Sequence, residues 1–380
     1  ILPGGQRPTG AFWFDAETGS FATSDYYSKD LPRWVNEFNR SVRPDKYFGD
    51  RWEPSPDIRG RAPDSGSTGK GFHHTITGGA EKPGPEFYTA FQETPFASEY
   101  LEQFAIAAIA GESLGVDGTP DLLSVSFSST DLIGHAHGPD SPEVADTYAR
   151  LDRVIADLLD QVDRRVGLQN SLVVLTGDHG VAPIPEEMQA RGFYAAAIRS
   201  RDLIPAAKNA LTARFGDGKW VLAIVNDQLY LDRALIAERK IDPAEAERVA
   251  GEGALAVAGI MDFYTRSQIL EGRLPDGPIA RRVSHGFNRL RSGDVWLITR
   301  PFSLVLEGAL RTTHGTAYGY DTHVPIVFYG PGMEPGRYTV ECSPSDIAPT
   351  LAALLDIEGP ANAVGHVLPV ANEHRVRRLK

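Results

Sequence analysis

The stretch SLVVLTGDHG, residues 171–180, places an acid and an imidazole at the end of an apolar run. Inside a strand, neighbouring side chains point to opposite faces. Asp178 and His179 can therefore reach one target only if the backbone turns there, and the flanking Gly177 and Gly180 allow such a turn. Open α/β sheets bind their ligands at the carboxyl ends of parallel strands. The pair therefore predicts a ligand site, and it raises the question of a metal ion.

The segments around this stretch predict an α/β fold. Residues 120–131 read as a buried strand that leads to an acid, and residues 141–167 as a long amphipathic helix with Ser at the N-cap and Pro in the first turn. Strand, helix and strand in this length form a βαβ unit. Residues 324–333 add a core strand and residues 343–360 a capped helix. We expect a mostly parallel central sheet with helices on both faces.

The middle of the chain changes character and predicts an inserted cap. We expect a catalytic core from residues 1–182 and 311–380, with residues 183–310 as the cap or lid. The other expected elements are short strands in 1–30, a helix in 30–41, a long ordered loop in 50–95, a helix in 96–115, a helix near 202–215, a strand pair in 219–232, a helix in 241–259 and a strand in 293–306.

Composition excludes several classes of protein. The chain has 380 residues, 42% of them hydrophobic, and a formal net charge of -12 at pH 7, so no basic surface for nucleic acid is expected. No apolar run approaches the ~18–20 residues of a membrane span. Cys342 is the only cysteine, which excludes an intrachain disulfide and a thiolate-rich metal site. Residue 1 is Ile and no signal-peptide pattern follows, so we expect further sequence upstream.

Other acids and histidines fall beside predicted strand ends. Asp131 and His135 lie four residues apart, which puts them on one side of a helical turn. His314 lies in a Gly-rich loop, and His323 directly precedes the core strand at 324–333. Oxygen and nitrogen ligands without thiolate suit zinc in a catalytic setting. Two metal ions ~3.5–4 Å apart would clamp the attacking and leaving oxygens of a phosphoryl group.

At each single position a purely structural role competes with the role of metal ligand, because an isolated Asp-x-x-x-His or a His in a loop is common. The joint occurrence of these residues at three loops favours a site. We expect His137 to be a loop residue near the ligands rather than a ligand. His73 and His74 lie in a Gly-rich loop and are expected to be structural. Three further histidines lack a partner pattern and are expected to be structural or exposed: His285, His366 and His374.

Three motifs resemble the alkaline phosphatase superfamily. They are TDLIGHAHGPD at 130–140, LTGDHGVAP at 175–183 and THGTAYGYDTHVPIVFYGPG at 313–332. They are most similar to the type I phosphodiesterase/nucleotide pyrophosphatase branch and to the bacterial phosphate-irrepressible alkaline phosphatases within it. ILPGGQRPTGAFWFD at the start of the chain also resembles that phosphatase subgroup, so the likeness covers most of the chain.

The resemblance implies a role for each matching residue. Asp131, His135 and His314 would hold one zinc, and Asp178 with His179 would contribute to a second. His323 would support the site without binding metal, because the first His of the third motif matches the ligand better. No other cofactor is implied.

The resemblance also implies the activity. We expect a zinc-dependent phosphate monoester hydrolase that acts by two-metal in-line transfer through a covalent Thr or Ser phosphoenzyme. The family's nucleophile precedes the segment that starts this chain, so we expect it upstream. Thr68, Thr75 and Thr77 lie in loops without the strand and helix that a nucleophile needs. Its substrates would be small phosphate esters, its location periplasmic or secreted with a signal peptide upstream, and its state monomeric.

Alternatives remain open at this point. A phosphodiesterase or nucleotide pyrophosphatase would use the same metal ligands, and a diester preference of tenfold or more would favour it. A non-catalytic zinc-binding polypeptide follows if these 380 residues are the whole protein, because no nucleophile would then exist. A plain α/β binding protein gives no reason for five ligand-type residues at three strand ends.

Overall fold

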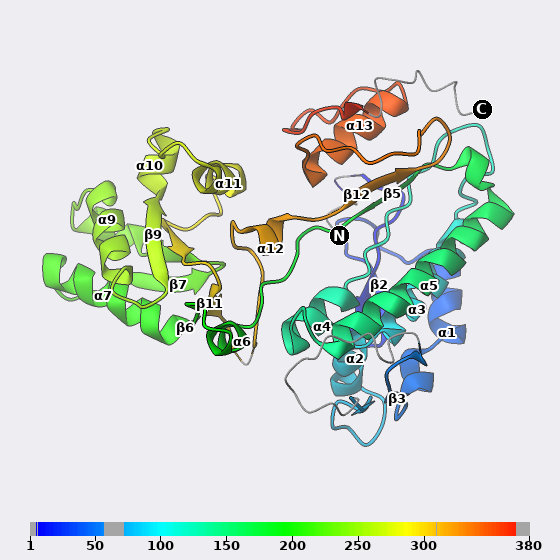
Figure 1. Ribbon diagram of the computed structural model, residues 1–380, viewed down its shortest axis with the longest axis horizontal. Helices are drawn as coiled ribbons and strands as arrows, with labels where there is room; N and C mark the ends of the chain where they lie inside the picture. The colour runs from blue at the N-terminus through cyan, green and yellow to red at the C-terminus, as the bar shows by residue number, and fades with distance from the viewer. Residues whose placement is uncertain (1–4, 6, 57–71, 309, 370–380) are drawn as a thin grey trace. The chain divides into compact units, whose positions relative to one another are not determined.

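The computed structural model of this chain describes residues 5, 7–56, 72–308 and 310–369 (Figure 1). The chain separates into two compact units. The first unit comprises Ile1–Ile133, Asp140–Asp178 and Pro325–Lys380, and the second comprises Gly134–Pro139 and His179–Val324. The predicted division into 1–182 with 311–380 and 183–310 draws its borders elsewhere and stays a prediction.

The first unit is mainly helical, with three short two-stranded ladders. Its elements are β1 (Trp13–Asp15), β2 (Ser20–Ala22), α1 (Arg33–Ser41), η2 (Pro44–Tyr47), β3 (Arg51–Trp52), β4 (His74–Thr75), α2 (Pro85–Gln92), α3 (Phe96–Gly111), α5 (Pro142–Arg165), η4 (Leu168–Asn170), β5 (Val173–Thr176), β12 (Ile326–Tyr329), η5 (Pro344–Asp346) and α13 (Ile347–Leu354). Helix α4 (Ser129–His137) begins in this unit and ends in the second.

Aromatic side chains fill the core of the first unit. Phe21 of β2 stacks on Phe104 of α3 with 3.7 Å between ring centroids, and Tyr100 lies one helical turn earlier on the same face. Helix α3 contacts α1, α2 and α5, so its apolar stripe is covered on several sides. Buried aromatic rings contribute large apolar areas and edge-to-face contacts, which stabilise this unit.

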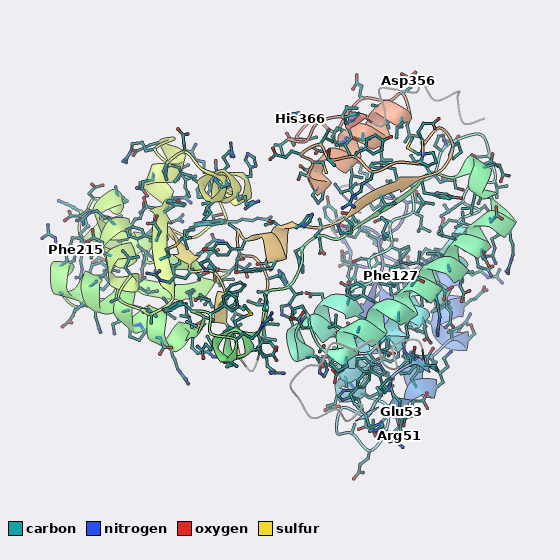
Figure 2. All side chains as sticks on the ribbon, viewed as in Figure 1. Arg51, Glu53, Phe127, Phe215, Asp356 and His366 are labelled. Carbon is teal, nitrogen blue, oxygen red and sulfur yellow. The ribbon has the colours of Figure 1, made fainter. Side chains whose placement is uncertain are left out.

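Asp146 explains why the segment after β3 is ordered. This fully buried carboxylate on α5 accepts hydrogen bonds from Trp52 Nε1 and from the Ser55 amide, both at 2.7 Å. Arg150, one turn later, pairs with the same carboxylate at 2.7 Å and neutralises its charge. Nearby at the surface, Arg51 and Glu53, labelled in Figure 2, form an exposed ion pair at 3.2 Å.

The second unit has a four-stranded antiparallel sheet in the order β7-β8-β10-β9, with α7 and α9 packed against each other and against it (Figure 1). A separate parallel ladder joins β6 to β11.

The elements of the second unit are α6 (Pro185–Ala190), β6 (Ala196–Arg199), α7 (Ser200–Phe215), β7 (Val221–Val225), β8 (Gln228–Leu231), α8 (Arg233–Glu238), α9 (Pro243–Ala254), β9 (Ile260–Thr265), α10 (Arg266–Leu270), α11 (Pro278–Gly286), β10 (Val295–Thr299), β11 (Ser303–Leu306) and α12 (Gly319–Thr322).

Two predicted features of the central sheet are wrong in detail. Residues 120–127 form no strand, and Leu122 is 79% exposed there. A parallel strand requires a neighbour to bond with, and none of the described residues pairs with this segment. Strand β5 exists, but it pairs antiparallel with β12 rather than within a βαβ unit. Within the described part of the chain, β6 and β11 are the one parallel pair.

The cap of α5 and the strand pair in 219–232 are confirmed, whereas two other expectations need correction. Ser141 caps α5, its hydroxyl accepting from the Val144 amide at 3.2 Å, and Pro142 begins the helix. The strand pair in 219–232 is the hairpin β7–β8. The strand expected over 293–306 is two strands, β10 and β11, separated by a turn at Phe302. The long loop expected in 50–95 contains the additional helix α2. None of the described helices combines the length and apolar character needed to cross a membrane.

Candidate metal centre

Three of the predicted ligands come together. Asp131 and His135 project from α4, four residues apart, and His314 lies in the loop before α12. One potential ligand atom of each residue lies within 4.8 Å of those of the other two. The ring centroids of His135 and His314 are 5.0 Å apart. All three side chains are half-buried, which leaves the group accessible to a metal ion.

Backbone carbonyls fix the proton on two of the histidines. His135 Nδ1 lies 2.9 Å from the Thr312 carbonyl oxygen, and His179 Nδ1 lies 2.9 Å from the Gly180 carbonyl oxygen. Because a carbonyl oxygen can only accept, Nδ1 is the donor in each ring. Such outer hydrogen bonds orient metal-binding histidines. In both imidazoles Nε2 is therefore the nitrogen that would bind a metal ion.

Asp178 and His179 follow β5, as predicted. The His179 ring stacks on the His314 ring with 3.4 Å between centroids and an interplanar angle of 14°. Asp178 is exposed. Among the described residues these two complete no group of three ligand atoms, so the predicted second metal has two candidate ligands within that part of the chain.

Two hydrogen bonds, one from a backbone amide and one from a side-chain hydroxyl, hold the two histidine-bearing loops of the second unit together. The Ala182 amide donates to the Thr313 carbonyl at 3.2 Å, and the Thr312 hydroxyl donates to the Ala182 carbonyl at 2.5 Å. Thr312 is fully buried. The same Thr312 carbonyl fixes the ring of His135, so this residue supports the ligand group through two contacts.

His323 does not join the ligands. It ends α12, it is exposed, and it belongs to none of the described ligand groups, which agrees with the expectation that His314 is the better candidate.

His74, expected to be a structural residue, contacts an acid and an aromatic ring. Its Nε2 lies 3.1 Å from Glu143 Oε1, and its ring packs on Phe72. His137 brings a ligand atom within 4.8 Å of both. Within this group, His74 and the buried Glu143 carboxylate lie at hydrogen-bonding distance.

None of the threonines weighed as nucleophiles gains support. Thr75 is an exposed residue of β4, and Thr77 caps a turn by accepting from the Gly79 amide at 3.2 Å. Thr68 lies outside the described residues.

Two carboxyl groups of the second unit are perturbed. Burial raises the pKa of Asp227 to about 7, and repulsion from Asp321 adds to the rise. Burial also raises the pKa of Asp321, while hydrogen bonds from Thr316 and the charge of His179 oppose this. Neither residue was predicted from the sequence. The only available signal for Asp321 was its place within the third motif.

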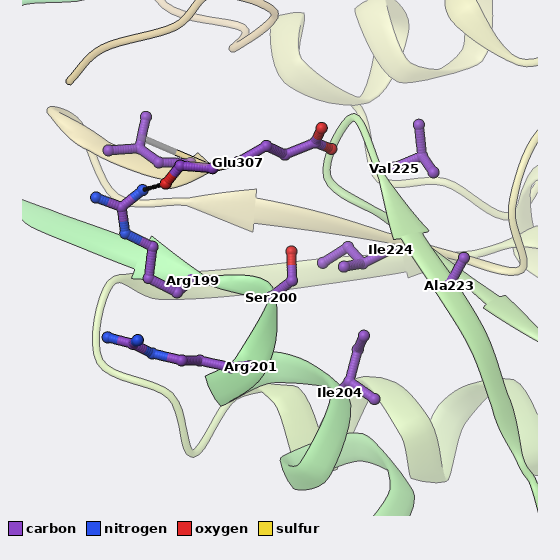
Figure 3. Close-up of a pocket in the computed structure, with 10 residues that line it drawn as sticks. Arg199, Ser200, Arg201, Ile204, Ala223, Ile224, Val225 and Glu307 are labelled. Atoms are coloured by element: carbon purple, nitrogen blue, oxygen red, sulfur yellow. Dashed lines mark hydrogen bonds between the residues drawn. The ribbon is translucent and has the colours of Figure 1, made fainter. Parts of the chain in front are cut away.

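A cavity of about 820 Å³ lies elsewhere in the second unit, beside the start of α7 (Figure 3). Arg199, Arg201 and Glu307 reach into its lining together with apolar side chains of β7. Arg199 Nη1 donates to the Gly308 carbonyl at 3.1 Å. None of the five predicted metal ligands lines this cavity, so it is separate from the ligand group.

Several known proteins are similar to this chain in sequence. Residues 5–321 match the family model described as type I phosphodiesterase / nucleotide pyrophosphatase. The chain is 36% identical over 381 residues to the alkaline phosphatase PafA of Elizabethkingia meningoseptica, an alignment that covers 96% of this chain and 68% of that protein. It is 33% identical to the alkaline phosphatase PhoV of Synechococcus elongatus, over 97% of this chain and 67% of that one.

The fold matches the crystal structure of wild-type alkaline phosphatase PafA with a TM-score of 0.86 and 34% sequence identity. The match covers 99% of this chain and 72% of the other. The predicted α/β class, with its alkaline-phosphatase-like arrangement, is thereby confirmed.

Proposed function

The chain belongs to the type I phosphodiesterase/nucleotide pyrophosphatase family, and from this premise we propose that it is a phosphoric monoester hydrolase of the alkaline phosphatase kind. The observation that carries the proposal is the convergence of Asp131, His135 and His314 within 4.8 Å. The names of its relatives PafA and PhoV favour monoesters as the substrate class.

The donor set fits zinc. One carboxylate and two imidazoles without thiolate leave an open position, as catalytic zinc sites do. In our proposal Asp131, His135 and His314 hold one zinc, and Asp178 with His179 contribute to a second. When bound, the metal ions would act as Lewis acids that stabilise the negative charge developing on the phosphoryl oxygens.

The chain's own residues prepare this site. The Thr312 and Gly180 carbonyls accept from Nδ1 of His135 and His179, so each ring is oriented with Nε2 as the nitrogen that would bind a metal ion. The covalent Thr or Ser phosphoenzyme remains part of the proposal, and we assign its nucleophile to no residue of this sequence. The periplasmic or secreted location and the monomeric state likewise remain predictions.

One observation favours a second candidate. The family model that matches residues 5–321 is named for phosphodiesterases and nucleotide pyrophosphatases. Rates on p-nitrophenyl phosphate and bis(p-nitrophenyl) phosphate separate the two functions. We expect the monoester to be hydrolysed faster, and a diester preference of tenfold or more would overturn the first proposal. Zinc binding without hydrolysis of either ester would favour the non-catalytic alternative.

The ligand assignment is tested by a matched pair of histidine variants. Zinc content is measured by elemental analysis after exhaustive buffer exchange, for the unmodified chain, His314→Ala and His323→Ala. We expect about one tightly bound zinc in the unmodified chain and in His323→Ala, and at least a tenfold weaker affinity in His314→Ala, because only His314 lies within the ligand group. Equal zinc content in both variants would contradict the assignment.

A further inference from the structure

Asp321 holds the loop that carries His314. Its side chain is 3% exposed, and its Oδ2 accepts hydrogen bonds from the Thr316 amide at 2.7 Å and from the Thr316 hydroxyl at 2.5 Å. Thr316 is two residues beyond His314. A carboxylate that accepts two hydrogen bonds from one residue fixes both its backbone and its side chain. The path of the chain just after His314 is therefore set by Asp321.

The same residue holds the loop that carries His179. The Asp321 carbonyl oxygen accepts from the Gly180 amide at 2.7 Å, directly after His179. A Cβ on Gly180 would lie 2.1 Å from the Tyr320 carbonyl oxygen, so only glycine permits this approach. Asp321 thus contacts both loops, one through its carboxylate and the other through its backbone.

Helix α12, on which Asp321 sits, is itself anchored to the turn between β10 and β11. The Tyr318 hydroxyl donates to the Thr299 carbonyl at 2.6 Å, and the Phe302 amide donates to the Tyr320 hydroxyl at 3.2 Å. The Phe302 and Tyr320 rings also stack, with 5.6 Å between centroids. Because these anchors immediately precede Asp321 in the sequence, the short helix is a fixed support rather than a free loop.

The chemistry of Asp321 goes beyond that of a simple loop clamp. Its second oxygen, Oδ1, is buried without a hydrogen-bond partner among the described residues. Burying a carboxylate oxygen without a hydrogen-bond partner lowers the free energy of unfolding. A smaller residue with a single hydroxyl, such as Ser, would avoid this cost. The two hydrogen bonds from Thr316 to Oδ2 offset part of this cost.

We propose that Asp321 is a positioning residue that sets the spacing between His179 and His314, acting on them through Gly180 and Thr316. The centroids of the two rings lie 3.4 Å apart in the structure. The inference rests on the proposed metal centre. Residues that orient metal ligands typically change metal affinity by ~10–100-fold when they are lost.

The first test measures metal affinity. Zinc and cobalt(II) affinities are determined by competition with a chromophoric chelator for the unmodified chain, Asp321→Ala, Asp321→Asn and the control Thr322→Ala, an exposed position on the same helix. We expect Asp321→Ala to bind either metal at least tenfold more weakly and to alter the visible spectrum of bound cobalt. Asp321→Asn keeps an acceptor for Thr316 and should recover most of the affinity, and Thr322→Ala should match the unmodified chain.

The second test needs no metal. Hydrogen–deuterium exchange, read by mass spectrometry over peptides covering 177–182 and 312–318, is compared among the same variants in the metal-free state. We expect faster exchange in both peptides for Asp321→Ala alone. Thr316→Val, which keeps the amide donor and removes the hydroxyl, should affect only the 312–318 peptide and so remains informative where Asp321→Ala fails to fold.

The outcomes separate the two proposals. Unchanged metal affinity and unchanged exchange in Asp321→Ala would overturn the positioning role while leaving the metal centre intact. Faster exchange in Asp321→Ala, together with an unmodified chain that binds no metal, would overturn the metal centre and with it the proposed purpose of the clamp.

Discussion

At the scale of single residues, the perturbed acid Asp227 gives a sharp test of the second unit. It lies in the tight turn between β7 and β8, where Asn226 and Asp227 both have positive φ. The residue as a whole is half-buried, whereas the surroundings of its carboxyl group are densely packed. Desolvation and the nearby Asp321 carboxylate both disfavour the charged form, which raises the pKa of Asp227 to about 7.

We predict that Asp227→Asn stabilises the protein more at pH 8 than at pH 5. The folded state holds the Asp227 proton up to about pH 7, whereas the unfolded chain releases it near pH ~4. The folded state therefore binds more protons over this interval, and its stability falls as the pH rises from about 4 to about 7. Asn removes this dependence and tolerates positive φ.

Urea unfolding at the two pH values measures this effect. The difference in unfolding free energy between Asp227→Asn and the unmodified chain should be larger at pH 8 by about 1 kcal/mol or more. Asp217→Asn, at an exposed acid of the same unit, serves as the control for general charge removal. An identical difference at both pH values would show that Asp227 ionises normally.

At the scale of elements, helix propensity and packing oppose each other at Gly253, where α9 contacts α7. Glycine inside a helix costs about 1 kcal/mol relative to alanine, so propensity favours replacement. A Cβ at Gly253 would lie 2.7 Å from Ala210 Cβ and 2.8 Å from the Ala206 carbonyl oxygen. The backbone carbonyl of α7 cannot rotate away, so packing should outweigh propensity.

We therefore predict that Gly253→Ala destabilises the second unit by about 1–2 kcal/mol, because overpacking typically costs about 1–3 kcal/mol. Glu252→Ala, at an exposed position of the same helix, should change stability by less than ~0.5 kcal/mol. Chemical denaturation followed by tryptophan fluorescence measures both. Stabilisation by Gly253→Ala would mean that α7 and α9 separate easily.

Elements with local signals could be predicted from sequence. Ser141 and Pro142 mark the start of α5 through chemistry confined to one turn, and the structure has the cap as expected. Residues 120–127 could not be predicted in the same way, because an apolar run becomes a strand only when a partner pairs with it. Phe302 adopts φ 62° and divides one expected strand into two. Bulky residues rarely adopt positive φ, so the sequence gives no signal for a turn at this position.

In the candidate site, too, local contacts could be predicted from the sequence and long-range contacts could not. Asp131 and His135 lie on one helical turn, so their proximity follows from spacing alone. That His314 joins them, and that His323 does not, depends on how the chain returns from distant residues. Asp321 was not predicted at all, because its contact with Gly180 exists only once two remote loops meet.

At the scale of the whole molecule, the β5–β12 ladder is an exposed apolar surface of the first unit. Leu175 and Val327 are cross-strand partners and are 45% and 47% exposed, and Tyr329 on the same face is 55% exposed. The ladder has two strands, so within the described residues each strand also has an unpaired edge. Open edges with apolar faces promote association between copies of a chain.

We predict that Leu175→Lys reduces self-association at high protein concentration, because a charged side chain on an edge strand opposes strand pairing. Leu290→Lys, at an 89% exposed leucine of the second unit, is the matched control for a simple gain of charge. Sedimentation velocity over a range of concentrations measures the effect. Equal reductions in both variants would show that the ladder is not the association surface.

The division of the chain has a consequence for the order in which the protein is made. Most of the second unit is one uninterrupted stretch, His179–Val324, whereas the first unit needs Pro325–Lys380 in addition to its early residues. Strand β5 leaves the ribosome long before β12, its ladder partner. Translation proceeds from the N-terminus, so the later-starting unit can finish first. The nascent first unit must then stay soluble with β5 unpaired until the last segment emerges.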